Sequence, residues 1–469
     1  MDITRRTMLQ GLGLAGGAAL ALPGFAAADP LDLAFRVRHK YRPFDLIAPR
    51  FVQYDTAIAP SVRNTLVDTG VRPRAPYGTV EVEVRSLAGT VVAGIGTVLG
   101  TYSSTGQVTI EVNGTVVASG TTTLPGAFRF AVVVNENAVT VLADATGTGT
   151  GWQPLLTERD GVRALIDLRD PQVLGTMNYV YGGRDSVLLG RVRAGYFGQA
   201  GVRDPHVVQH ADGRPYIRDG KLYLTLTNAG LGFFQQAHWG VWTLDLADPT
   251  RLEQVATLFF ARDGVVVGDH AGQIVVDGDR FILAMSSWGD FAFAGVHIRH
   301  VTTTANVLSG VHVLATSRLP LPTTVSSWDP ALTRIGSRWH VAFVESPAQS
   351  PAFVFHPALA VGPRGGSYFS DLALVGADLS VDQTEGTILQ KIDGAWWVLA
   401  SDGDAREYVV YDLRMRRHGT LDAPYGTNIP HPQVVRARDR WWMLTFDGTQ
   451  YAEPVLGYGG HGDFIVMSD

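Results

Sequence analysis

The sequence predicts an all-β protein in which a β-sandwich precedes a five-bladed β-propeller. Three observations carry this prediction. Short strands of alternating apolar and polar residues fill the first part of the chain, and a strand–turn–strand unit recurs along the second part. The 53 glycines and 24 prolines supply the many turns that such folds need. At 469 residues the chain is too long for one ordinary core, so two domains are expected.

The overall composition excludes several classes of protein. Hydrophobic residues make up 46% and charged residues 17% of the chain, as in globular proteins. The formal net charge of −6 gives no reason to expect nucleic acid or an anionic membrane as a partner. The absence of cysteine excludes disulfides and thiolate chemistry.

Residues 1–28 are interpreted as an export signal rather than as part of the fold. Arg5 and Arg6 precede the glycine-rich apolar stretch 11–25, and the small residues at 26–28 suit a cleavage site. This pattern resembles a twin-arginine (Tat) signal. An ordinary secretory signal and an uncleaved anchor are the alternatives. No later stretch reaches the roughly 20 apolar residues of a membrane span, so a secreted, periplasmic or wall-associated protein is expected.

Residues 29–194 are expected to form the β-sandwich. Gly78–Val84 alternates with period two, and Asn113-Gly114 between two apolar runs is a hairpin signal. A second hairpin is expected around Asn135–Asn137. Regular short strands of this kind favour a sandwich. At the level of fold alone, the segment resembles the lectin-like, concanavalin-type jelly-roll modules that are often joined to carbohydrate enzymes.

Residues 195–469 carry the repeat. Each unit has a polar residue, a short apolar strand, a tight turn and a second strand rich in apolar and aromatic residues. The leading polar residues are Asp204, Asp269, Asp329, Glu385 and His431. Their spacing of 46 to 65 residues suits units of four strands, and five such units predict a five-bladed propeller. Because the first strand of each blade starts at the central axis, the five leading side chains are expected to converge in a funnel.

Several carboxylates in one pocket repel each other, which raises the pKa of at least one of them. Glycoside hydrolysis needs such an arrangement, with one protonated carboxylic acid and one ionised carboxylate. The structural alternative is that each acid caps a turn or pairs with a nearby arginine. Four acids in the same register of successive repeats favour the catalytic interpretation.

Three short blocks carry a family resemblance: Arg203-Asp204-Pro205, Trp328-Asp329-Pro330 and Thr384-Glu385-Gly386. In order and spacing they resemble the catalytic blocks of glycoside hydrolase family 43 and its five-bladed relatives, which invert configuration and mostly act on arabinofuranosides and xylosides. The resemblance implies that Asp204 is the general base, that Asp329 orients the acid and raises its pKa, and that Glu385 is the general acid. It also implies that His431 lies near a central cation, frequently calcium, which the reaction itself does not require.

The second unit departs from the family. Where family members carry an aromatic residue, this chain has Asp269, and Thr387 replaces the proline that is common after Glu-Gly. Asp269 is therefore a candidate substrate ligand, or it replaces Asp329 in tuning the acid. Aromatic rings stack on sugars and polar side chains bind hydroxyls, so six residues are candidates for binding the substrate. They are Arg203, His206, Asp269, His270, Trp288 and Trp328.

The preferred hypothesis is an exported, inverting glycosidase that acts as a monomer on an arabinofuranosyl- or xylosyl-type polysaccharide or oligosaccharide. The alternative is a carbohydrate-binding propeller without catalysis. A lyase or a phosphorylase is a third possibility, but a phosphorylase needs basic residues for phosphate, and only Arg203 accompanies the leading residues.

Overall fold

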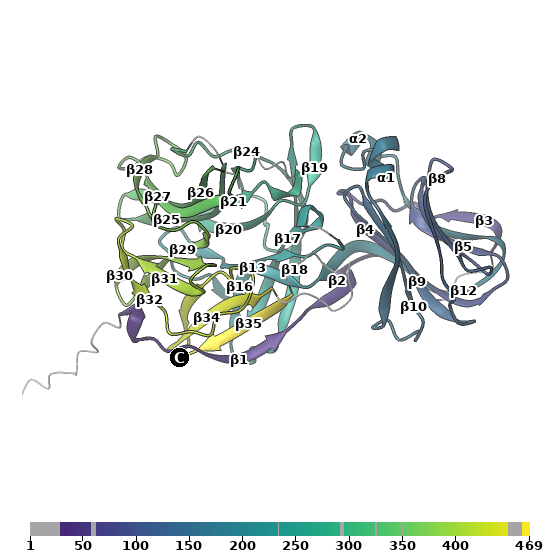
Figure 1. Ribbon diagram of the computed structural model, residues 1–469, viewed down its shortest axis with the longest axis horizontal. Coiled ribbons are helices and arrows are strands. Elements are labelled where there is room, and N and C mark those ends of the chain that lie inside the picture. Colours follow the sequence, from purple (N-terminus) through teal and green to yellow (C-terminus); the bar gives the residue numbers. More distant parts are fainter. Residues whose placement is uncertain are drawn as a thin grey trace, which may run out of the picture.

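The computed structural model describes residues 29–57, 62–232, 234–290, 295–323, 326–348, 350–448 and 462–469. Within these residues the protein is built from β-sheets, with two short α-helices, α1 (Asp160–Leu165) and α2 (Pro171–Leu174), so the all-β prediction is confirmed. A propeller-like ring of sheets lies beside a second body that is dominated by one large sheet (Figure 1). The predicted export signal lies outside the described residues, and no helix within them is long and apolar enough to cross a membrane.

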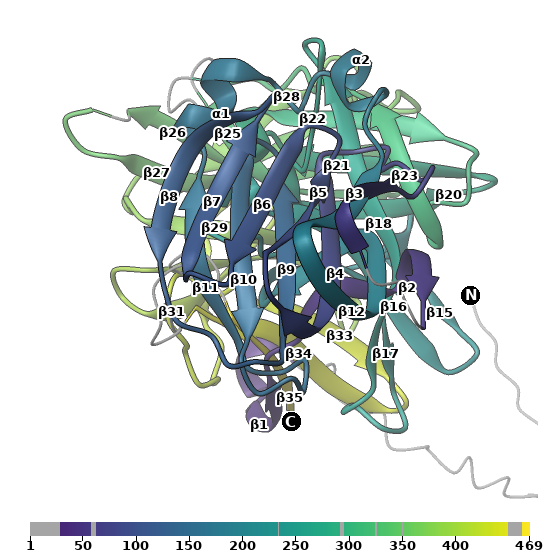
Figure 2. The ribbon, with the colours of Figure 1, turned by 90° about the vertical axis from the view of Figure 1, so that its right-hand side faces the viewer.

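The second body, residues 44–200, is called the N-terminal body below. Its eleven-stranded sheet has the order β11-β10-β9-β4-β12-β5-β6-β7-β8, and β2 and β3 also pair with β12. The strands are β2 (Phe44–Thr56), β3 (Val62–Asp68), β4 (Tyr77–Leu87), β5 (Thr90–Ile95), β6 (Val98–Ser103), β7 (Gln107–Val112), β8 (Thr115–Thr121), β9 (Phe128–Asn135), β10 (Ala138–Asp144), β11 (Trp152–Glu158) and β12 (Tyr179–Ala200). Figure 2 shows β5 to β9 running in front of the ring.

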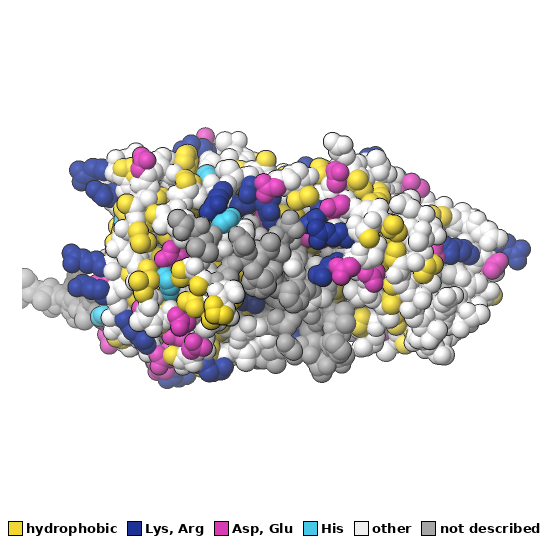
Figure 3. All heavy atoms as spheres, turned by 45° about the horizontal axis from the view of Figure 1, so that its top comes forward, with side chains coloured by type: hydrophobic (Ala, Val, Ile, Leu, Met, Phe, Trp, Pro, Cys, Tyr) yellow, Lys and Arg dark blue, Asp and Glu magenta, His cyan; other side chains and the backbone are white. Residues whose placement is uncertain are grey.

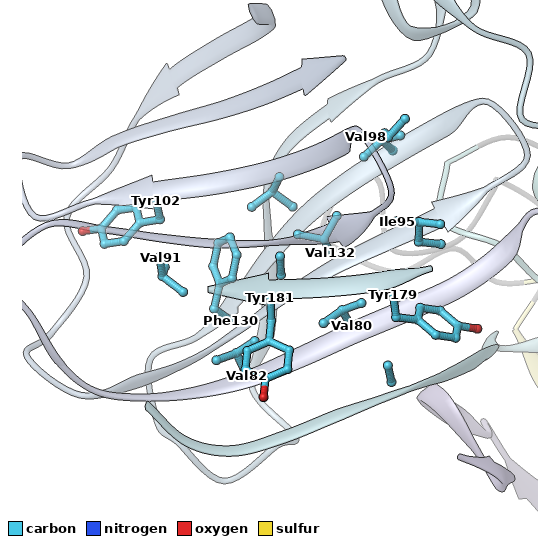
Figure 4. Packing of buried hydrophobic residues seen from close by; sticks show 14 of the residues in the cluster. Val80, Val82, Val91, Ile95, Val98, Tyr102, Phe130, Val132, Tyr179 and Tyr181 are labelled. Carbon is cyan, nitrogen blue, oxygen red and sulfur yellow. The ribbon is translucent and has the colours of Figure 1, made fainter. Parts of the chain in front are cut away.

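The core of the N-terminal body forms from the alternating apolar positions that the sequence displays. Val80 and Val82 of β4 pack with Phe130 and Val132 of β9, and Val98 of β6 belongs to the same buried cluster (Figure 4). The period of two places these side chains on one face of each strand. Both predicted hairpins form, since β7 pairs with β8 and β9 pairs with β10.

Within the described residues the ring contains five sheets. In the first four of them, the strand that comes earliest in the sequence lies at one edge of the sheet. The first is formed by β13 (Val202–Val207), β16 (Lys221–Asn228), β17 (His238–Asp245), β18 (Leu252–Arg262) and β19 (Val265–Val267), with β15 (Ile217–Arg218) and β23 (Gly310–Ala315) attached. The second is formed by β14 (Gln209–His210), β20 (His270–Asp277), β21 (Arg280–Ser286), β22 (Ile298–Thr303) and β24 (Ser317–Arg318). The third runs through β25 (Ser326–Ile335), β26 (Arg338–Ala348), β27 (Val354–Val361) and β28 (Ala373–Ala377), and the fourth through β29 (Thr384–Ile392), β30 (Ala395–Asp402), β31 (Glu407–Tyr411) and β32 (Arg417–Thr420).

The last sheet joins the two ends of the chain. It contains β33 (Gln433–Ala437), β34 (Arg440–Asp447), β35 (Asp463–Ser468) and the N-terminal strand β1 (Arg36–Tyr41). The sequence placed β1 in the sandwich, but β1 pairs antiparallel with β35 and so belongs to the ring. Its alternation is that of any half-exposed strand and does not reveal which sheet the strand joins. Lys40 of β1 adds ion pairs to Asp447 at 2.6 Å and to Asp463 at 3.1 Å.

Buried glutamines connect the sheets around the axis of the ring. The amide N–H of Val207 in the first sheet donates to Gln433 Oε1 of the last sheet at 2.8 Å. The amide N–H of Leu332 in the third sheet donates to Gln273 Oε1 of the second sheet at 2.6 Å. Because buried polar groups are costly when unpaired, these bonds specify how neighbouring sheets align.

Candidate active site

A β-bulge lies near the start of four strands, β13, β20, β25 and β29, which belong to four different sheets of the ring. The register shifts between Arg203 and His206 in β13, between His270 and Gly272 in β20, between Trp328 and Ala331 in β25, and between Glu385 and Ile388 in β29. A bulge inserts an extra residue and redirects the neighbouring side chains, and bulges are common beside active sites. The repeated bulge therefore marks one end of the ring as the candidate site.

The bulges define which residues of the repeat are equivalent. One residue in each bulge has a positive φ: Asp204 at 53°, Ala271 at 51°, Asp329 at 49° and Gly386 at 72°. The residues that pair just before the bulge are Arg203, His270, Trp328 and Glu385.

This equivalence corrects the register inferred from the sequence. Glu385 lies one residue before the position of Asp204 and Asp329, and Asp269 lies two residues before it. The sequence pattern aligned the acidic residues with one another, but these residues occupy different positions relative to the bulge. The acid at 385 therefore projects from a different level of the ring than the two aspartates.

A small cavity of about 10 Å³ lies where the first strands meet. It is lined by Asp204, Pro205, His206, Ala271, Gly272, Asp329, Pro330, Thr387, Ile388 and His431. Such a volume is about what one water molecule needs. Asp204, Asp329 and His431 therefore converge from separate sheets or loops, whereas Asp269 and Glu385, which were also predicted to converge, do not line this cavity.

Asp204 is held as an ionised carboxylate. Its Oδ1 accepts a hydrogen bond from Arg203 Nε at 2.9 Å, and its Oδ2 accepts one from Thr227 Oγ1 at 2.7 Å. Burial acts to raise the pKa of Asp204, but the charges of Arg203 and His431 outweigh it and lower the pKa to about 2. Asp204 is therefore negative throughout the range in which a general base would work.

Glu385 has the opposite electrostatic character. Burial raises its pKa to about 7; the Arg203 charge opposes this rise and the Asp204 charge adds to it. Trp328 Nε1 donates a hydrogen bond to Glu385 Oε2 at 3.1 Å, and Arg203 Nη2 lies 3.8 Å from Oε1. Glu385 therefore retains its proton below neutral pH, as a general acid must.

Asp329 is the third carboxyl group of the candidate site, and it interacts with both Asp204 and Glu385. Burial raises its pKa well above the usual range, and the charges of Glu385 and Asp204 raise it further. Its Oδ2 accepts a hydrogen bond from the amide N–H of Gly386 at 2.9 Å. Asp329 thereby fixes the backbone next to Glu385. The charge that most raises the pKa of Glu385 belongs to Asp204, rather than to either aspartate that the sequence proposed for tuning.

His431 approaches both aspartates. Its Nε2 lies 3.6 Å from Asp204 Oδ1 and 3.4 Å from Asp329 Oδ2. Burial lowers the pKa of His431 to about 4, although Asp204 acts to raise it, so the ring is neutral at pH 5 and above. A Cβ on Gly386 would overlap the His431 ring, so the close approach requires glycine at position 386.

The two candidate tryptophans differ in their surroundings. Trp328 is 1% exposed and packs against Trp288, with 5.3 Å between ring centroids. Trp328 therefore orients Glu385 through its indole N–H and has no exposed ring face on which a sugar could stack. Trp288 is half-buried and belongs to the 3₁₀ turn Trp288–Asp290. Of the two, only Trp288 has the exposure that stacking on a sugar requires.

Asp269 forms a buried ion pair with Arg262. Arg262 holds it with two hydrogen bonds, of 2.7 and 2.9 Å, and the amide N–H of Gly289 donates to the same carboxylate at 3.0 Å. The side chain is 0% exposed. This geometry favours a structural role for Asp269 over contact with a substrate.

The two candidate histidines lie close to Asp204. His206 lines the central cavity, and burial lowers its pKa to about 3, which keeps the ring neutral. His270 is 4% exposed, and its charge acts to lower the pKa of Asp204. Both positions are compatible with binding hydroxyl groups in the funnel.

The residues do not fit a cation held directly by side chains. Among the described residues, no group of three or more histidine, aspartate or glutamate side chains could hold a metal ion. Calcium takes six to eight oxygen ligands. Both oxygens of Asp204 are already engaged by Arg203 and Thr227. No step of the chemistry below is therefore assigned to a metal at His431.

Three further residues complete the site beyond those that the sequence indicated. Thr227 binds Asp204, Gly386 admits His431, and Phe446 lies 4.7 Å from the Arg203 guanidinium. The Asp-Pro pairs at 204–205 and 329–330 were a usable signal for the bulges, because proline in a strand is confined to edges and bulges. Thr227 and Phe446 lie on strands that give no such local signal.

No protein-family model and no curated protein matches the sequence. Solved structures give weak similarities. A GH43_1 enzyme from Xanthomonas citri has 14% identity over 57% of this chain and 87% of that chain, with a TM-score of 0.39. CoXyl43, a GH43 β-xylosidase/α-arabinofuranosidase from a compost metagenome, has 13% identity over 57% and 91% of the two chains, with a TM-score of 0.40. An α-L-arabinanase from Penicillium chrysogenum has 11% identity over 74% and 91%, with a TM-score of 0.35. At such low scores the function has to follow from the residues of the site.

Proposed function

We propose that the protein is a glycoside hydrolase that inverts configuration, with Asp204 as general base and Glu385 as general acid. One observation carries the proposal: two buried carboxyl groups on either side of the Arg203 guanidinium, at 2.9 and 3.8 Å, have pKa values of about 2 and about 7. A pair of titratable groups whose surroundings separate their pKa values in this way is typical of an acid and base pair.

In the proposed reaction, Asp204 accepts a proton from a water molecule whose oxygen attacks the anomeric carbon. The bond from that carbon to the leaving oxygen breaks, and Glu385 donates its proton to this oxygen. The products are a sugar of inverted configuration and a free hydroxyl on the leaving group. Asp204 is then protonated and Glu385 ionised, and exchange with solvent restores both.

The separation of the carboxyl groups is compatible with this mechanism. One planar guanidinium reaches Asp204 at 2.9 Å and Glu385 at 3.8 Å. The two contacted oxygens therefore lie no more than roughly 9 Å apart, against the roughly 6.5–9.5 Å of inverting enzymes.

The charge of the pocket favours a neutral sugar. At about pH 6, Asp204 is negative, Arg203 is positive, and burial keeps Glu385 and Asp329 protonated by raising their pKa values. The funnel therefore has little net charge to attract a uronate or a phosphate. We propose an arabinofuranosyl- or xylosyl-type polysaccharide or oligosaccharide as substrate, on the basis of the three blocks around Asp204, Asp329 and Glu385.

We extend the proposal to the architecture and the location. The five sheets are the blades of a five-bladed propeller, and the N-terminal body is a concanavalin-like jelly-roll sandwich. Residues 1–28 are a Tat-type signal that exports a monomeric enzyme. On the face in Figure 3, lysine and arginine side chains are interspersed with acidic ones.

The test compares the wild type with Glu385→Gln and Asp204→Asn on arabinan, xylan and nitrophenyl pentosides. Each variant is expected to lose at least 10²-fold in kcat, since each removes one proton-transfer partner. The anomer released first, followed by NMR, should be inverted. Asp277→Asn, at the far end of β20 and 20% exposed, is the matched control and should retain wild-type turnover. Full turnover in both site variants would refute the assignment.

One observation favours a second candidate, a propeller that binds carbohydrate without hydrolysing it. Asp204 is engaged by both Arg203 and Thr227, which leaves less of its carboxylate free for a water molecule. Calorimetric binding of an oligosaccharide by a wild-type protein with no turnover on any substrate of the panel would support this candidate.

A further inference from the structure

The N-terminal body is fixed to the ring through a buried apolar surface. Tyr77 of β4 stacks on Phe259 of β18, with 5.1 Å between ring centroids, and Tyr196 of β12 also stacks on Phe259, at 5.7 Å. Leu231 and Val266 of the ring belong to the same buried cluster. The long strands β2 and β12 cross between the two bodies (Figure 1). The body is therefore docked and not merely tethered.

The docked surface reaches the bulged end of the ring. Strand β13 starts at that end, so the antiparallel pairing places the end of β16, the start of β17 and the end of β18 at the same end. The turn between β9 and β10 touches these segments: Asn135 Oδ1 accepts a hydrogen bond from the amide N–H of Leu231 at 3.0 Å. The amide N–H of Val266 donates to the carbonyl oxygen of Arg169 at 2.8 Å.

The same turn holds Gly268, two residues before β20 starts. Glu136 Oε1 accepts a hydrogen bond from the amide N–H of Gly268 at 3.3 Å, and the Tyr77 hydroxyl lies 3.0 Å from the same oxygen. The Tyr77 hydroxyl also lies 2.9 Å from the carbonyl oxygen of Ala237. A Cβ on Gly268 would overlap both Tyr77 and Ala237, so this contact is closely fitted.

Gly268 is linked to the candidate general base through hydrogen bonds of the backbone that follows it. Three residues later in β20, the amide N–H of Ala271 donates to Thr227 Oγ1 at 3.1 Å. The same hydroxyl donates to Asp204 Oδ2 at 2.7 Å. The position of the Ala271 amide thus determines whether Thr227 can direct its proton at Asp204.

We propose that the turn between β9 and β10 positions the general base, with Glu136 and Tyr77 acting through Gly268, Ala271 and Thr227. The N-terminal body then contributes to the positioning of a catalytic residue of the ring. The catalytic meaning of this positioning rests on the function proposed above for Asp204.

The experiment uses the full chain with Tyr77→Phe, Glu136→Ala and the conservative Glu136→Gln. Tyr102→Phe is the matched control, because its hydroxyl accepts a hydrogen bond from the Leu124 amide within the N-terminal body at 3.0 Å, away from the ring. Hydrogen exchange is followed in the segment 262–272, with 384–402 as internal reference. kcat and KM are measured on the substrate that the wild type hydrolyses best.

Tyr77→Phe and Glu136→Ala are expected to exchange at least tenfold faster in 262–272 but not in the reference segment. In both, kcat should fall about tenfold with KM within twofold of the wild type, because a misplaced base affects the chemical step. Glu136→Gln should restore both values, and Tyr102→Phe should leave both unchanged.

Unchanged exchange in Tyr77→Phe and Glu136→Ala would overturn the inference, whatever the activity. Faster exchange with wild-type kcat would overturn the link to the general base. A wild type without turnover on any glycoside would instead refute the proposed function, and the exchange result would still decide whether the turn holds β20.

Discussion

Trp328 of the third sheet donates its indole N–H to Glu385 of the fourth sheet, with 3.1 Å between Nε1 and Oε2. The bond stabilises the charged form of Glu385 and so acts to lower its pKa, against the larger effect of burial. Trp328 also lies in the apolar cluster with Phe355 and Val344, which holds the indole in place. Trp328 of one sheet thus influences the pKa of the candidate acid, Glu385, of the next sheet.

The pH profile of kcat/KM should reflect this bond. A general acid with a pKa of about 7 must be protonated to act, so activity should fall as the pH rises through about 7. Trp328→Phe removes a hydrogen bond that favours the ionised form, so the pKa of Glu385 rises and the alkaline limb should move to higher pH. A limb that moves to lower pH would contradict the assignment of Glu385 as acid.

The acid limb should respond to Thr227. The hydroxyl of Thr227 stabilises ionised Asp204, whose pKa is about 2. Thr227→Val should raise this pKa, so that activity is lost at a higher pH on the acid side. A hydrogen bond to a charged group contributes roughly 1.5–3 kcal/mol, which corresponds to a shift of about one to two pH units. Thr243→Val, whose buried hydroxyl has no hydrogen-bond partner among the described residues, is the control.

Gly386→Ala should damage both stability and activity. Position 386 has a φ of 72°, and an added Cβ would overlap the His431 ring. A left-handed conformation alone costs a side chain roughly 1–3 kcal/mol, and the overlap adds to this cost. Denaturant unfolding should show the loss. Gly120→Ala is the control, because its added Cβ would have its nearest neighbour, Leu156, at 3.8 Å. A wild-type unfolding midpoint in Gly386→Ala would contradict the tight packing of His431 against position 386.

The stability of the protein should depend on Glu136. Burial raises the pKa of Glu136 to about 8 from a usual value of 4.5. The folded state therefore holds a proton that the unfolded state has released between these two values, so stability falls as the pH rises through this window and levels off above about pH 8. The slope is at most roughly 1.4 kcal/mol per pH unit. Glu136→Gln has no such proton, so its melting temperature relative to the wild type should rise from pH 5 to pH 8; a constant difference would show that Glu136 does not titrate in this way.

Local chemistry made part of this structure predictable. Asn113 and Gly114 both adopt positive φ, at 52° and 79°, in the hairpin that their pairing predicted. The convergence of Asp204, Asp329 and His431 followed from the repeat alone. These features depend on residues that are neighbours in sequence or equivalent in successive repeats.

Long-range pairing made the rest unpredictable. The register that linked Asp269 and Glu385 to Asp204 was wrong because it aligned acidic residues, whereas the bulges make Ala271 and Gly386 equivalent to Asp204. The hydrogen bond from Arg262 to Asp269 forms only because the chain reverses direction between these residues. The burial of Trp328 depends on three aromatic neighbours, Trp288, Phe353 and Phe355. The placement of β1 required knowledge of a partner at the opposite end of the chain.

That last pairing governs the order of assembly. Arg36 lies opposite Ser468, the penultimate residue, so the sheet that closes the ring cannot form until synthesis has reached the final strand. Contacts between such distant parts of a chain carry a large loop-closure entropy and form slowly. Until then β1 remains an unpaired edge that a second nascent chain could capture. Truncation at either end should therefore yield an open ring that is prone to self-association, rather than a slightly shortened protein.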